Sequence, residues 1–172
     1  MSSVFIRCGL VSVLLLSLAH GAAAAGPDGC DVFPWPVTRE RAALAANDLP
    51  RVESGAELAA LPAGAIRLAL KPLAEAALPA TPERAPAAER FAGFVRIRQV
   101  ARPGATSIAL AAAGWVDVVQ NGKLLKPAGF SGAPQCPGLR KLVRYDLGPG
   151  ETLLQLSGVS SDSLVLAILP VE

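Results

Sequence analysis

Apolar and polar residues alternate along short segments in the second half of the chain, from Phe91 onward. In residues 115–120, for example, Val116 and Val118 fall on one side and Asp117 on the other. A two-residue period is typical of a β-strand with one buried face, and Gly, Pro or Asn separates successive segments, as turns require. The pattern predicts strands over residues 94–100, 105–112, 115–120, 123–126, 139–147, 152–157 and 164–169. Such a series predicts a mainly β chain with an antiparallel β-sandwich or jelly-roll-like domain.

The strongest local signal in this half is the dipeptide Asn121-Gly122. Both residues tolerate positive φ, so they suit the two central positions of a type I′ turn. We therefore expect a tight hairpin between residues 115–120 and 123–126. The last segment, residues 164–169, is apolar on both sides, which is typical of a central strand.

The chain before residue 91 carries helical signals and many prolines. Residues 38–47 begin at a Thr and end at an Asn, as a short helix does, and Ser54-Gly55-Ala56-Glu57 is a capping box for a second short helix ending at Leu61. Residues 65–70 alternate like a strand, and prolines then interrupt residues 73–90. We expect residues 26–90 to form a helical and proline-rich arm packed on a β-sandwich domain of residues 91–172.

The first 25 residues have the pattern of a secretory signal peptide. The apolar run of residues 10–18 is too short to span a bilayer, and Ala23 and Ala25 precede Gly26 in the small-residue arrangement of a cleavage site. We expect residues 1–25 to be removed, which places the mature protein in the periplasm or outside the cell with no stable membrane span. An uncleaved N-terminal anchor is the alternative.

Composition excludes several classes of partner and of active site. The chain of 172 residues carries 16 Lys and Arg against 14 Asp and Glu, a near balance that argues against nucleic acid as a partner. The single histidine, His20, lies in the signal segment. Without imidazole, the mature protein lacks the base of Ser-His-Asp and Cys-His hydrolases and the nitrogen ligands of zinc, haem and non-haem iron sites. No calcium-loop motif occurs either, and we expect no metal site and no cofactor.

Two of the three cysteines, Cys30 and Cys136, remain after removal of residues 1–25. An even pair in an oxidising compartment predicts a disulfide between them. It closes a loop of about a hundred residues, which contributes roughly 4–5 kcal/mol in the chain-entropy model. Two free thiols acting as a redox pair are the alternative, although they lack the C-x-x-C spacing.

Three motifs stand out in the mature chain. They are residues 115–122 (Trp-Val-Asp-Val-Val-Gln-Asn-Gly), 136–141 (Cys-Pro-Gly-Leu-Arg-Lys) and 30–36 (Cys-Asp-Val-Phe-Pro-Trp-Pro). Together they resemble a family of uncharacterised small exported proteins of proteobacteria, and the resemblance implies no catalytic residues. At the level of fold, the rhythm of strands and turns is also similar to the jelly-roll modules of secreted hydrolases, but a fold does not determine a function.

Trp115 and Asp117 are the first candidates for a ligand-binding site. On the predicted strand they share the side opposite Val116 and Val118, where an indole beside a carboxylate forms a platform for a sugar ring. The alternative is that Trp115 faces inward and packs the sandwich core.

Arg140, Arg144 and Trp35 are further candidates. The two arginines belong to a charged strand face, which is either solvated surface or a site for an anionic glycan or a carboxylate. Trp35, between two prolines, is either an anchor of the arm or a partner-binding peptide in polyproline conformation.

These features favour an exported, non-catalytic β-sandwich protein that binds or scaffolds an unknown envelope protein or glycan. A carbohydrate-recognition module that uses Trp115 and the charged strand face is the second hypothesis. The third is a carboxylate-dependent hydrolase, with Asp117 and either Asp146 or Glu151 as acid and base. Burial of Trp115 and the placement of these carboxylates distinguish the three.

Overall fold

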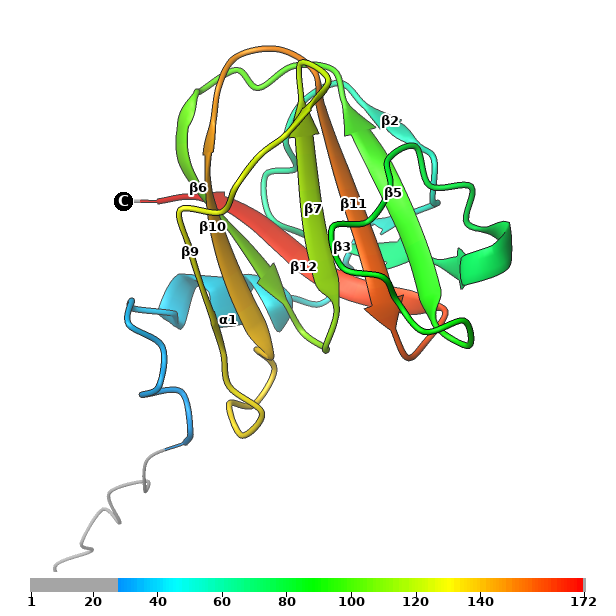
Figure 1. The fold of residues 1–172 in the computed structure, drawn as a ribbon. Helices are drawn as coiled ribbons and strands as arrows, with labels where there is room; N and C mark the ends of the chain where they lie inside the picture. Colours follow the sequence, from blue (N-terminus) through cyan, green and yellow to red (C-terminus); the bar gives the residue numbers. More distant parts are fainter. Residues whose placement is uncertain (1–27, 172) are drawn as a thin grey trace, which may run out of the picture.

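A computed structural model describes residues 28–171, and the predicted signal peptide lies outside these described residues. Two mixed six-stranded sheets pack face to face, with one short helix against the outside of one of them (Figure 1). The elements are β1 (Arg51–Val52), β2 (Glu57–Leu58), β3 (Ala65–Ala69), β4 (Lys71–Pro72), β5 (Phe91–Ile97), β6 (Gly104–Leu110), β7 (Trp115–Gln120), β8 (Lys123–Leu124), β9 (Gly129–Gly132), β10 (Lys141–Leu147), β11 (Thr152–Val159), β12 (Ser163–Pro170), the α-helix α1 (Thr38–Leu44) and the 3₁₀ turn η1 (Leu73–Glu75). The first sheet has the order β1-β3-β12-β6-β10-β9, and the second has the order β2-β5-β11-β7-β8 with β4 also paired to β5.

Eight of these strands form an antiparallel double sheet with jelly-roll connectivity. β3, β12, β6 and β10 are antiparallel neighbours in the first sheet, as are β5, β11, β7 and β8 in the second. Every connection between successive members of the eight crosses between the sheets, except the β7–β8 hairpin. The predicted fold class, a mainly β, jelly-roll-like sandwich, is therefore confirmed, and the short strands β1 and β2 add parallel pairs at its edges.

The predicted hairpin at Asn121-Gly122 is confirmed. Asn121 has φ of 52° and Gly122 has φ of 72°, which are the left-handed conformations of a type I′ turn. The register Val119↔Leu124 and Gln120↔Lys123 leaves these two residues as the whole loop. At the centre of the first sheet, β12 lies between β3 and β6, as its apolar character on both sides predicted.

The chain before residue 91 is part of the sandwich. The strand predicted at residues 65–70 is present as β3, and it pairs with β12 in the first sheet. β2 and β4 both pair with β5 in the second sheet. The sheets therefore include residues on both sides of position 90, where we expected the boundary between an arm and a β-sandwich domain. β9 lies between the segments predicted as strands at residues 123–126 and 139–147, where no strand was predicted, and its backbone pairs with β10 at the edge of the first sheet.

The helix predictions are half right. α1 is present, but Val37 precedes it without a side-chain capping hydrogen bond, so Thr38 does not act as its cap. The second helix, expected to begin at the capping box of Ser54, does not form. The Ser54 hydroxyl instead accepts a hydrogen bond from the Phe94 N–H (3.2 Å), and the backbone beyond it pairs with β5. Tertiary pairing with a strand edge therefore overrides the local helix signal.

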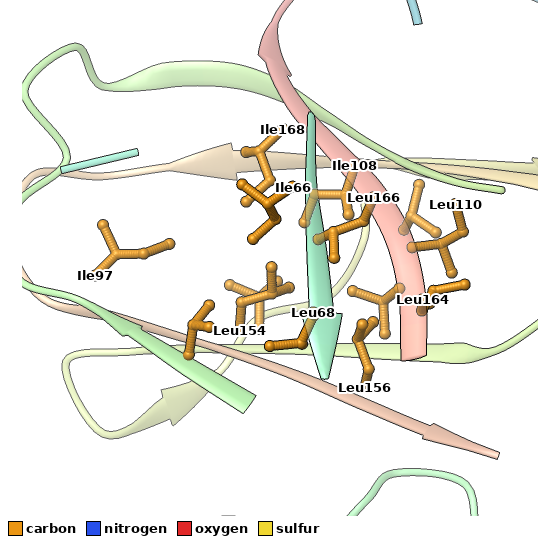
Figure 2. Close-up of a cluster of buried hydrophobic side chains, with 14 of the residues drawn as sticks. Ile66, Leu68, Ile97, Ile108, Leu110, Leu154, Leu156, Leu164, Leu166 and Ile168 are labelled. Carbon is orange, nitrogen blue, oxygen red and sulfur yellow. The ribbon is translucent and has the colours of Figure 1, made fainter. Parts of the chain in front are cut away.

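Leucine, isoleucine and valine side chains fill the space between the two sheets. Leu154 and Leu156 of β11 and Ile97 of β5 face Leu68, Ile108 and their neighbours from the first sheet (Figure 2). Leu68 and Leu156 are completely enclosed. At roughly 1.5–3 kcal/mol for each fully buried aliphatic side chain, this cluster is the main source of stability.

A second apolar cluster covers the outer face of the first sheet. There α1 lies against the first sheet (Figure 1), and apolar side chains from α1 and the segment before it cluster with Leu142, Ala109 and Ala167. Cys30 and Cys136 form the predicted disulfide within this cluster, with a sequence separation of 106 residues and Cα atoms 4.6 Å apart. The N-terminal segment is thereby covalently fixed to the loop between β9 and β10.

Residues 79–90, which we call the strap, cross the outer face of the second sheet over β7 and β11. Gln155 of β11 holds it, since its side-chain amide donates to the Ala80 carbonyl (3.0 Å) and accepts from the Ala80 N–H (3.2 Å). Gln155 is completely buried beneath the strap. The segment predicted to be non-periodic and proline-rich is thus a fixed part of the molecule that encloses polar side chains of the sheet.

Candidate functional site

A groove opens where the edges of the two sheets separate. Two adjoining cavities, of about 640 Å³ and about 560 Å³, both have Trp115 of β7, Phe130 of β9, Lys141 of β10 and Arg84 of the strap in their walls. We call them together the Trp115 groove. Their sizes fall in the range of pockets that hold small ligands.

Trp115 lies partly buried at the start of β7, on the outer side of the second sheet. Its indole N–H donates a hydrogen bond to Asp117 Oδ1 (2.9 Å), which fixes the orientation of the ring. The Lys141 ammonium lies over the ring, 4.5 Å from its centroid, and the Arg84 guanidinium lies 5.8 Å from the same centroid. Trp115 is therefore neither a core residue nor a bare platform, because cations already occupy positions over the indole.

Asp117 supports this ring from beneath the strap. It shares the predicted side of β7 with Trp115, but it is only 2% exposed and does not line the groove. Burial raises the pKa of Asp117, and the hydrogen bond from Trp115 partly counters that rise. Interactions with the Glu83 backbone and the Gln155 side chain also lower this pKa. The carboxyl therefore positions the indole and is not available to a ligand in the groove.

Basic side chains dominate the groove walls. Arg84 and Arg90 enter from the strap, and Arg140 and Lys141 enter from the start of β10. Lys141 Nζ also donates to the Gly114 carbonyl (3.2 Å). Burial lowers the pKa of Lys141, and the proximity of Arg84 lowers it further, as expected when like charges gather.

The charged strand face predicted from Arg140 and Arg144 is divided between two places. Arg140 joins Trp115 in the groove. Arg144 instead stacks on Trp35, with its guanidinium 4.2 Å from the ring centroid, and Trp35 belongs to the cluster outside the first sheet. An added Cβ at Gly129 would come within 3.0 Å of the Trp35 ring, so glycine is what allows this close packing. These contacts match the anchoring alternative for Trp35, while a partner for it stays a hypothesis.

Alternation along β10 contains a signal for a residue that we did not single out. Lys141 falls on the same side of the strand as Val143 and Tyr145, which are core residues. A cation on the apolar side of a strand indicates that the core is open at that end. Arg84 and Phe130 carried no comparable signal, because their positions depend on the strap and on β9.

The carboxylates proposed for hydrolysis lie in different places. Asp117 lies under the strap on the second sheet, whereas Asp146 is exposed on the outer side of the first sheet. Glu151 lies in the turn before β11, where Arg96 Nη1 is 3.6 Å from its Oε1. The structure therefore does not bring Asp117 together with either expected partner.

The described residues contain no group of three or more His, Cys, Asp or Glu side chains arranged to hold a metal ion. None of the helices in residues 28–171 is long and apolar enough to cross a membrane. No family model, curated protein or solved structure matches the chain. Its resemblance to small exported proteobacterial proteins stays a prediction.

Proposed function

We propose that the mature protein is an exported, non-catalytic binding protein and that its ligand occupies the Trp115 groove. The observation that carries the proposal is the fixed indole of Trp115 at the wall of an open groove, with cationic side chains around it. A carboxyl that is only 2% exposed is costly to a fold, and here it holds the indole in place. Such a cost is typical of a site that has to keep a defined shape.

The predicted leader and the Cys30–Cys136 disulfide fit a periplasmic or secreted location. The strap and the disulfide-bonded segment give the domain a fixed exterior, as a binding protein that works outside the cytoplasm requires. Carbohydrate is the ligand class with the most support, because the groove combines aromatic rings with polar side chains and has an open side.

A glycan array tests this proposal. We expect the purified mature protein to bind a subset of glycans, Trp115→Ala to lose that binding, and Trp35→Ala to retain it. Trp35 is the matched control because it is the other tryptophan of the chain and lies outside the groove. Urea unfolding of both variants verifies that each is folded. Binding that survives in Trp115→Ala, or no binding by the wild-type protein, would show that the proposal is wrong.

A further inference from the structure

The larger cavity of the Trp115 groove is strongly asymmetric in charge. Arg84, Arg90, Arg140 and Lys141 line it, and no Asp or Glu is found among its lining residues within the described chain. Arg84, Arg140 and Lys141 take part in none of the ion pairs between described residues. Acidic side chains lie only beside this cavity: Glu83 lines the adjoining smaller cavity, and the buried Asp117 acts on Lys141. A chain with a nearly balanced overall charge thus gathers an excess of cations in one hollow. Such an arrangement raises the local concentration of anions.

Hydroxyl groups and a second aromatic ring line the same cavity. Ser131 and Ser160 line the cavity, Ser160 at an exposed position and Ser131 half-buried. Phe130 is 69% exposed, and its ring is free to contact a ligand on the open side. Apolar ring faces, hydroxyl partners and cations in one hollow correspond to the three parts of an acidic sugar: its C–H face, its hydroxyls and its carboxylate.

We propose that the ligand of the groove is an acidic glycan, a chain of hexuronic acid residues, whose carboxylate is bound by Arg140 and Lys141. This inference rests on the proposed binding function and specifies its ligand. The sugar ring lies in the cavity of about 640 Å³, with Phe130 against one side and Arg84 of the strap near its other charged groups. Since Lys141 and Arg84 already lie over the Trp115 ring, a neutral sugar has to displace them to stack there, whereas an acidic sugar binds to them.

The basic residues gather in one short groove, which suits an oligosaccharide better than a nucleic acid backbone, because the latter requires a longer basic stripe. A free phosphate ion would pair with the basic side chains, but it would make no contact with the aromatic rings and hydroxyl groups that line the cavity. The wall composition therefore favours an acidic sugar over a simple inorganic anion.

Titration calorimetry with defined oligosaccharides tests the inference. The probes are trisaccharides of galacturonate, glucuronate and mannuronate, the neutral trisaccharide of each corresponding sugar, and inorganic phosphate. We expect at least one uronate to bind at least tenfold more tightly than its neutral counterpart, and binding to weaken as NaCl is raised from 20 to 300 mM. We expect Arg140→Gln to weaken uronate binding about 10- to 100-fold, the range for loss of a charge-assisted hydrogen bond.

Arg98→Gln is the matched control, because Arg98 is exposed and lies outside the groove. It should bind the uronate as the wild-type protein does. Neutral sugars that bind as tightly as uronates, with Trp115→Ala still abolishing binding, would overturn the acidic ligand and leave the proposed function standing. Phosphate binding without uronate binding, or no binding of any uronate, also overturns this inference. Uronate binding that is unchanged in Trp115→Ala would instead contradict the location given by the proposed function.

Discussion

The outer faces of the two sheets are both covered, but by opposite chemistry. On the first sheet, Leu142 and Ala167 pack against the helix and a disulfide in an apolar cluster. On the second sheet, Asp117, Gln155 and Ser157 are buried polar side chains under a strap that Gln155 holds by two hydrogen bonds. The apolar face stabilises the fold, whereas the polar face costs stability and holds the groove in shape. The polar face supports one wall of the groove, while Phe130 and Lys141 of the first sheet supply the other.

Removing the disulfide should have the largest effect on the first face. We expect Cys30→Ala/Cys136→Ala to lose about 4–5 kcal/mol of unfolding free energy, because the bond closes a long loop in the unfolded chain. Urea unfolding of the double variant and of the wild-type protein measures the loss. Equal midpoints would show that the apolar packing alone fixes the N-terminal segment.

Truncation of a core side chain on the same face should have the next largest effect. Leu142 is completely buried among the residues of this apolar cluster, so Leu142→Ala should cost about 3 kcal/mol through lost burial and the cavity left behind. Leu124→Ala is the control, since Leu124 is 43% exposed and its truncation should change stability little. Similar losses for the two variants would contradict the role given to this cluster.

Release of the strap should cost less. Gln155→Ala removes both hydrogen bonds to Ala80, and we expect a loss of about 1–2 kcal/mol because the freed backbone groups regain water. We also expect faster trypsin cleavage after Arg84 while the disulfide-bonded face remains protected. Gln99→Ala, at an exposed position, should cleave like the wild-type protein. A strap that stays equally resistant in Gln155→Ala would show that other contacts hold it.

The smallest effect should come from the charge of Asp117 and should depend on pH. Because burial raises the pKa of Asp117 above its ordinary 3.8, the folded state holds this proton to a higher pH than the unfolded state does. The contribution of this carboxyl to stability therefore falls as pH rises from 3.8 through the raised pKa. Relative to the wild-type protein, Asp117→Asn should gain stability over that window, as urea midpoints between pH 3 and pH 8 would measure. A stability difference between Asp117→Asn and the wild-type protein that does not change with pH would show that folding does not raise the pKa of Asp117.

Alternation and turn residues were sufficient to predict most of the sandwich. The two-residue period located the strands from β5 onward, apart from β9, and Asn121-Gly122 located the β7–β8 hairpin. The same local rules failed at Ser54, since its hydroxyl binds the backbone of β5, which lies far away in sequence. Local propensity cannot report a partner that only the tertiary fold supplies.

The candidate site was predicted only in part. Strand alternation placed Trp115 and Asp117 on one side of β7, but it contained nothing about the strap that buries one and leaves the other at the groove. Arg84 lies in a segment with no period, so its place over the indole follows from tertiary contacts alone. Arg140 and Arg144 fall on the same side of the predicted strand, so alternation does not distinguish them. In the structure, Arg140 lies in the groove and Arg144 stacks on Trp35.

The central positions of β11 and β12 determine when this fold is able to form. β12 separates β3 from β6, and β11 separates β5 from β7, so each of these two strands joins two parts of its sheet that come earlier in the sequence. While the chain is being synthesised, β6, β10 and β9 can pair with one another and β7 can pair with β8, but β3 and β5 lack the strands that join them to the rest of their sheets. Completion of both sheets therefore waits for β11 and β12, and the many contacts between residues distant in sequence favour slow folding.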